Sequence, residues 1–380
     1  MSLLLTEDQQ LLKQSAAEFV KNESPVSRVR HYRDNRDALG FSRELWTKMA
    51  ELGWPAILLP ERYGGLGMGY KDIACVLEEC GRNLVPEPIL STVLLGANAI
   101  LLSGSDRQKE ELLPLVASGR LLLALAYHER GARHDVHVDK TRAVERGGTY
   151  ALSGTKVLVF DGHAADKLVV AARTSGNEND RDGITLFLVD AGAPGLRVSR
   201  QWTVDSRGAA LVELNEVEVD RGAVLGELGC GAAVLEDVID RATLGLCAEM
   251  LGTAARAFEM TLEYLKTRKQ FGVPIGSFQA LKHRAAKMFI EIELARSAVL
   301  GACAALDDAA PNWRELVSLA KARCSDTAAL VGYEGIQMHG GIGMTDEHDI
   351  GLYAKRARAT EILFGDAAHH RARFAALQGY

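Results

Sequence analysis

Two short segments carry residues suited to bind a phosphate group and a flat ring. They are Arg268–Gln279 (RKQFGVPIGSFQ) and Gln337–Gly343 (QMHGGIG). A guanidinium group offers forked donors to phosphate oxygens, and the phenyl ring of Phe271 offers a flat apolar face. Glycines in the second segment allow backbone N–H groups to approach a phosphate or an adenine. For Arg268 alone, the alternative is a basic helix end that complements the helix dipole. That alternative does not explain Gln279 or the second segment at its spacing.

The composition limits the class of protein. The 380 residues are 47% hydrophobic and 25% charged, which fits a soluble globular chain with two or three packed parts. A net charge of −6 does not suggest nucleic-acid binding, and no apolar run reaches membrane-span length. The six cysteines are scattered and the ten histidines lack metal-ligand spacing, so we expect buried thiols and no metal. The first ten residues lack the basic region of a signal peptide, which favours a cytoplasmic location.

The elements that must position these segments change character along the chain. Residues 1–120 predict a helical domain, with a cap at Thr6 and helices over 42–52, 71–80 and 106–118. Residues 121–225 predict an antiparallel β-sandwich or barrel, because short β-branched runs alternate with Gly and Asp. The expected strands lie at 122–127, 149–152, 156–159, 168–172, 184–189 and 209–219.

Residues 226–380 predict a C-terminal four-helix bundle. Residues 232–267 contain no proline, so a helix about 50 Å long is expected there, ended by Pro274 and Gly276. Further helices are expected over 277–308, 312–336 and 347–376. The predicted fold class is therefore α+β, in the order helical domain, antiparallel β-domain and helical bundle.

This layout resembles the acyl-CoA dehydrogenase family over the whole chain. Residues 53–67, with Trp54 and the run PERYGGLG, are similar to the family's N-terminal signature. Residues 268–272 are similar to its Arg-x-x-Phe-Gly segment, and 337–343 to its Gln-x-x-Gly-Gly-x-Gly segment. The resemblance implies FAD, with Arg268 reaching the pyrophosphate of a neighbouring subunit's FAD. The implied cofactor-binding residues are Arg268, Gln270, Phe271, Gln279, Gln337, Gly340 and Gly341.

The β-domain departs from the family at the flavin. Where the family has Thr-Glu-Pro-x-Ala-Gly-Ser-Asp, residues 127–135 are YHERGARHD, in which only a Gly-Ala and Asp135 are recognisable. Where the family has Trp-x-Thr beside the isoalloxazine, this chain has Leu158 and Phe160. A hydroxyl donor and an indole wall are both missing. We expect these two side chains to belong to the core of the strand.

The family's catalytic glutamate is also missing from its usual position. Abstraction of an acyl α-proton needs a carboxylate whose pKa is raised by an apolar pocket. Phe364 stands at the position where a glutamate is expected. Asp240 and Glu361 are weak candidates: Asp240 is two residues from the alternative family position, and Glu361 lies one turn before Phe364. Glu249 is expected to be a buried or interface carboxylate.

Three functions remain open at this stage. The first is a base-lacking subunit of a heteromeric acyl-CoA dehydrogenase, in which a related chain supplies the flavin wall and the base. Its substrate would be a bulky or unusual acyl-CoA, such as a sterol side-chain, dicarboxylic or aromatic thioester. The second is a self-sufficient homotetramer with a relocated base, and the third is a silent FAD-binding or assembly scaffold. The family also implies an electron-transfer flavoprotein as electron acceptor.

Overall fold

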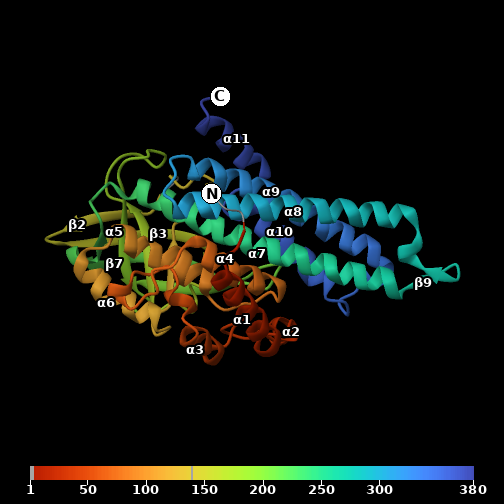
Figure 1. The fold of residues 1–380 in the computed structure, drawn as a ribbon. Coiled ribbons are helices and arrows are strands. Elements are labelled where there is room, and N and C mark those ends of the chain that lie inside the picture. The colour runs from red at the N-terminus through yellow and green to blue at the C-terminus, as the bar shows by residue number, and fades with distance from the viewer. Residues whose placement is uncertain (1–3, 138–139) are drawn as a thin grey trace. The chain divides into compact units, whose positions relative to one another are not determined.

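The computed structural model describes residues 4–137 and 140–380, and Figure 1 shows the chain. They form two compact units, each described by itself. The first contains residues up to 31, 69–85 and 243–380, and the second contains 32–68 and 86–242. The boundary near residue 242 falls inside one long helix, α7 (Gly231–Thr267). The three-domain division at residues 120 and 225 stays a prediction.

The second unit is built on an eight-stranded sheet. The strand order is β6-β7-β3-β2-β4-β5-β8, and β1 pairs with β4. The pairings are antiparallel except those of β1 and β2 with β4. Leu152, Val170 and Phe187 are fully buried in its core. The strands are β1 (Leu123–Ala126), β2 (Arg142–Arg146), β3 (Thr149–Phe160), β4 (Lys167–Arg173), β5 (Ile184–Asp190), β6 (Leu196–Trp202), β7 (Gly208–Asp220) and β8 (Val224–Leu225). The runs expected at 149–152 and 156–159 form one strand, β3, whose pairing with β7 shifts register twice.

The same unit also contains helices. Segment η3 packs against β1, where the Thr92 hydroxyl accepts a hydrogen bond from Leu123 N. The helical elements are α3 (Arg43–Glu51), η3 (Leu90–Ala97), α5 (Asn98–Ser103) and α6 (Asp106–Ala117), while α2 (Ser27–Asp34) crosses the boundary between the units.

The first unit is helical. Helix α1 begins at the expected cap, where Thr6 and Gln9 exchange reciprocal hydrogen bonds in a capping box. Helix α9 packs against α8, α10 and α11. Among the described residues, no helix is long and apolar enough to cross a membrane. The elements are α1 (Glu7–Glu23), α4 (Tyr70–Arg82), α8 (Gln279–Asp307), α9 (Trp313–His339), η6 (Gly340–Met344), α10 (Ile350–Ile362), α11 (Ala367–Leu377) and the strands β9 (Lys269–Gln270) and β10 (Val273–Pro274).

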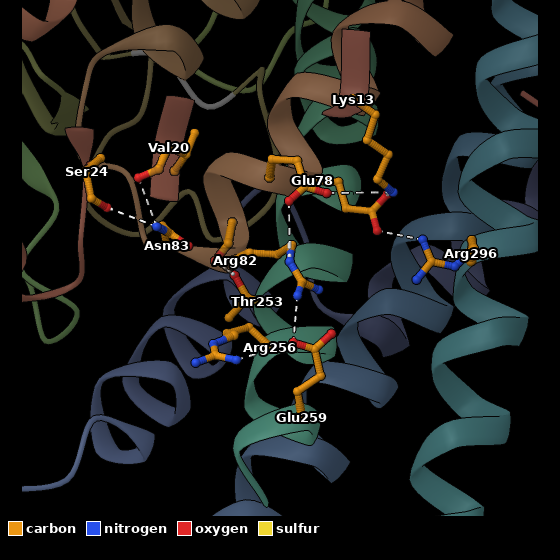
Figure 2. Close-up of polar contacts among 12 residues, drawn as sticks. Lys13, Val20, Ser24, Glu78, Arg82, Asn83, Thr253, Arg256, Glu259 and Arg296 are labelled. Atoms are coloured by element: carbon orange, nitrogen blue, oxygen red, sulfur yellow. Dashed lines mark hydrogen bonds and ion pairs between the residues drawn. The ribbon is translucent and has the colours of Figure 1, made fainter. Parts of the chain in front are cut away.

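Helices α4 and α7 approach closely at two glycines. A Cβ on Gly81 would lie 2.0 Å from the Glu249 carbonyl oxygen, and one on Gly252 would lie 1.8 Å from that of Glu78. Only glycine allows this separation. Figure 2 shows the polar contacts that accompany it, including the ion pair of Arg82 with Glu259 at 2.6 Å.

The expected single helix over 347–376 is wrong. The structure has two helices, α10 and α11, separated at Phe364 and Gly365. Both residues have positive φ, 59° and 112°, which ends a right-handed helix. Asp366 then caps α11 by accepting a hydrogen bond from His369 N at 2.8 Å. The break falls at the position where the sequence comparison expects a glutamate.

Candidate functional site

The Arg268–Gln279 segment forms an exposed hairpin after α7. Strands β9 and β10 pair at Gln270 and Val273, and the two-residue turn between them is Phe271-Gly272 with φ of 51° and 79°. Two consecutive positive φ values are typical of the tight turn that joins antiparallel strands. Phe271 therefore lies at the tip of the hairpin. The hairpin, labelled β9 in Figure 1, projects away from the helices that it joins.

The side chains of this hairpin face solvent. Phe271 is 90% exposed and makes an edge contact with Phe278, with ring centroids 6.0 Å apart. Arg268, Gln270 and Gln279 are exposed as well. Exposure of a phenyl ring to water is unfavourable, but the ring could pack against a flat ring of a ligand while the neighbouring cation and amides bind its phosphate. These four predicted site residues lie together on one short segment.

The Gln337–Gly343 segment contributes His339 to a stack of three rings. His339 is stacked on Tyr264, with centroids 4.7 Å apart, and is 4.3 Å from the ring of His348. Tyr264 belongs to the last turn of α7, and its carbonyl oxygen accepts a hydrogen bond from Arg268 N at 2.9 Å. The stack therefore joins the two predicted segments within the first unit.

The glycine turn that follows His339 leaves its backbone accessible at Gly340 and Gly341. Gly340 has φ of 64° and ψ of −139°, a conformation that favours glycine. A Cβ at Gly340 or Gly341 would meet nothing within 4 Å, so both positions face open space. Gln337 is exposed beside them. Together with Arg268, this open glycine turn fits the phosphate and adenine parts of a dinucleotide.

The expectation that Leu158 belongs to the strand core is wrong. Leu158 is 46% exposed, and Phe160 is half-buried. The pairing of β3 with β7 skips from Lys156 to Val159, and Leu158 has φ of 51°, so its side chain leaves the alternating pattern of the strand. Its N–H donates to Gln201 Oε1 at 3.0 Å.

Glu129 is the residue that sequence reasoning missed in this region. Its buried carboxylate lies 2.8 Å from Lys156 Nζ and accepts hydrogen bonds from the backbone N–H groups of Lys140 and Thr141 and from the Thr141 hydroxyl. Burial raises its pKa, but the charge of Lys156 and these donors outweigh burial and lower the pKa to about 2. Glu129 thereby fixes the loop after β1 against Lys156 of β3, and Lys156 is two residues before Leu158 in that strand. Glu129 stands where the family's Thr-Glu-Pro run has its glutamate, and this match could have identified it from the sequence.

Phe364 is buried at the turn between α10 and α11, with 9% exposure. Its carbonyl oxygen accepts a hydrogen bond from His370 Nε2 at 3.0 Å, and that of Gly365 accepts one from Lys321 Nζ at 2.7 Å. Both donors are themselves buried. A phenyl ring thus occupies a rigidly held position, and it can neither accept nor deliver a proton.

The two weak candidates for the base lie on different helices. Asp240 is 4% exposed on α7, and Glu361, on α10, forms an ion pair with Arg358 at 2.7 Å. Glu249 is buried, as expected, and pairs with Arg356 at 2.8 Å. In the parts of the chain that the structure describes, no group of His, Cys, Asp or Glu could hold a metal ion.

Comparison with known proteins places the chain in a family. Models of the acyl-CoA dehydrogenase N-terminal, middle and C-terminal domains match residues 6–120, 124–220 and 229–377. The chain is an oxidoreductase that belongs to the acyl-CoA dehydrogenase family, and FAD is its cofactor. The resemblance inferred from the sequence is confirmed.

Individual relatives cover nearly the whole chain. The probable acyl-CoA dehydrogenase YngJ of Bacillus subtilis (strain 168) is 30% identical over 368 residues, which is 95% of each chain. The structure of butyryl-CoA dehydrogenase from Megasphaera elsdenii has a TM-score of 0.92 at 27% identity and full coverage of both chains. That of the ChsE4–ChsE5 complex from Mycobacterium tuberculosis has a TM-score of 0.88 at 29% identity, covering 100% of this chain and 99% of the other.

Proposed function

We propose that this chain is the base-lacking subunit of a heteromeric acyl-CoA dehydrogenase. The observation that carries the proposal is Phe364, a buried phenyl ring held by its carbonyl at the position of the expected glutamate. FAD, when bound, accepts the hydride that leaves the β-carbon of the acyl thioester. Removal of the α-proton needs a carboxylate, which the partner chain supplies in this proposal.

The retained segments support a contribution to the partner's flavin. Arg268 and Phe271 are exposed on the hairpin, and Gly340 and Gly341 face open space. These groups suit the pyrophosphate and adenine of an FAD whose isoalloxazine lies on a related chain. Gln270, Gln279 and Gln337 complete the proposed cofactor-binding set. One structural neighbour is itself a complex of two named chains, ChsE4 and ChsE5.

The proposed substrate is a bulky or unusual acyl-CoA, in the class of sterol side-chain, dicarboxylic or aromatic thioesters. The proposed electron acceptor is an electron-transfer flavoprotein, and the proposed location is the cytoplasm. Asp240 and Glu361 remain the candidate bases if the chain acts alone as a homotetramer.

The test is an absorbance spectrum of the chain purified alone and after co-expression with a related chain that carries Trp-x-Thr and the glutamate. We expect flavin bands and bleaching by acyl-CoA only in the mixed complex, with fewer flavins than chains. Bleaching by this chain alone contradicts the proposal and favours the self-sufficient enzyme. Colourless protein without acyl-CoA binding, even with the partner, favours a scaffold.

Arg268→Met tests the role of the hairpin in the same complex. We expect this variant to lose flavin, because a charge-assisted contact to phosphate disappears. Lys287→Met is the matched control, since Lys287 is an exposed cation on α8 outside the hairpin. Unchanged flavin content and assembly in Arg268→Met would refute the assigned contact.

A further inference from the structure

The residues around the exposed hairpin carry positive charge that the flavin contact does not account for. Residues 264–290 contain six Lys and Arg and no Asp or Glu. Because the whole chain has a net charge of −6 and this segment carries +6, the rest of the chain carries −12. A strongly basic segment on an acidic chain is typical of a surface that meets an anionic partner.

Five of these six cations lack a carboxylate partner. Arg284 pairs with Glu334 at 2.5 Å, and Glu263, just before the segment, contacts Arg256 at 3.9 Å. The five other side chains form no ion pair with the residues that the structure describes, and all are exposed. They are Lys266, Arg268, Lys269, Lys282 and Lys287. The described part of the chain therefore does not neutralise this positive charge.

The fold gathers four of the five cations. The hairpin folds back on the end of α7, where Ile275 N–H donates to the Arg268 carbonyl oxygen at 2.8 Å. Helix α8 begins at Gln279, directly after Phe278, whose ring lies 6.0 Å from that of Phe271. The last turn of α7, the hairpin labelled β9 in Figure 1 and the first turn of α8 therefore lie together. They carry Lys266, Arg268, Lys269 and Lys282, which we call the basic apex.

The stability of the helix ends explains only part of the basic apex. Lys266 lies in the last turn of α7, where a cation complements the helix dipole. Lys282 lies in the first turn of α8, which has no acidic residue and where a cation opposes the dipole. Local stability therefore does not account for Lys282, and a contact outside the chain does.

We propose that the basic apex docks on a rim of Asp and Glu side chains around the flavin site of the related chain, an inference that rests on the proposed function. In that function Arg268 contacts the FAD pyrophosphate, and one pyrophosphate does not balance the three lysines beside it. Charges at the rim of an interface mainly change the association rate, because opposite charges steer the two surfaces together.

Stopped-flow light scattering of the two purified full-length chains measures that rate, with the related chain that carries Trp-x-Thr and the glutamate. At about 0.1 M ionic strength, we expect Lys282→Glu to slow association about fivefold and Lys21→Glu to change it by less than about 1.5-fold. Lys21 is the matched control, because it is exposed on α1 and forms no ion pair with the described residues. Both variants change the net charge equally, so their difference reports the position of the charge.

The difference should disappear at about 1 M ionic strength, where the Debye length is about 3 Å. A defect in folding would persist there. Lys266→Glu should behave like Lys282→Glu and keeps the test decisive if that variant does not fold. Equal association rates for the apex variants and Lys21→Glu would overturn this inference alone. The absence of any mixed complex with wild type would instead overturn the proposed function on which it rests.

Discussion

The ion pair of Glu129 and Lys156 gives the sharpest prediction about stability. Lys156 is fully buried, and its Nζ lies 2.8 Å from a carboxylate whose side chain is only 5% exposed. Lys156→Met removes the cation and leaves the anion in place, with only the backbone and hydroxyl donors of Lys140 and Thr141. An unpaired buried charge is strongly destabilising.

The magnitude follows from the pKa of Glu129. Its fall from 4.5 to about 2 in the folded chain corresponds to about 3.5 kcal/mol, at roughly 1.4 kcal/mol per pH unit. Because the folded pKa is the lower one, this contribution is complete above pH 4.5 and is lost as the pH falls toward about 2. Breaking a buried pair costs about 3–5 kcal/mol, so we expect Lys156→Met to lower the free energy of unfolding by about that amount at pH 7.

Urea denaturation of the wild type and three variants separates the cost of the unpaired charge from the loss of the ion pair itself. Lys156→Met should be strongly destabilised, and Lys156→Met combined with Glu129→Gln should recover most of the loss, since no charge remains buried. Lys167→Met, which breaks an exposed pair with Asp190, should cost less than about 1 kcal/mol. A loss in Lys156→Met as small as in Lys167→Met would refute the reasoning, and so would the absence of recovery in the double variant.

Three further predictions concern the helical unit and α7. Gly365→Ala should destabilise by about 1–3 kcal/mol, because φ is 112° and a Cβ would lie 2.5 Å from His369 Cδ2, whereas Gly351→Ala should be neutral in the same thermal unfolding experiment. Burial lowers the pKa of Lys321 to about 8 in the folded chain, below its ordinary value of 10.5. Between these two pH values only the unfolded chain binds the proton, so the contribution of Lys321 to stability should increase as the pH rises from about 8 to 10.5. The difference in the free energy of unfolding between wild type and Lys321→Met should increase over the same range, and a difference that does not change with pH would contradict this reasoning. Asp240→Asn should retain exchange of the acyl α-proton in the flavin-loaded complex, and loss of exchange with FAD and substrate still bound would identify Asp240 as the base.

The sequence alone predicted most helix limits in this chain. The cap at Thr6, helix α3 after Ser42 and the long helix α7 ending at Thr267 all lie where capping and apolar periodicity place them. These features depend on neighbours within a few residues, so they can be inferred without knowing the fold. The family resemblance was readable for the same reason, since its segments are contiguous.

The sequence missed two strands that carry little of the buried pattern by which a strand is recognised. Strand β6 has no buried side chain and strand β2 has one, too few for either to stand out from the loops around it. They become strands because β7 and β3 supply the hydrogen bonds. The buried pair of Glu129 and Lys156 is hidden for a different reason, because 27 residues separate the two partners.

Tertiary structure decided the features that bear on catalysis. The turn at Phe364 exists because His370 and Lys321 bind its carbonyl oxygens, and Leu158 faces outward because β3 shifts against β7. From the sequence we expected a glutamate, a hydroxyl and an indole to be missing from their family positions. Whether the replacing side chains are buried or exposed depends on hydrogen bonds between segments far apart in the chain, and short-range sequence patterns carry no record of them.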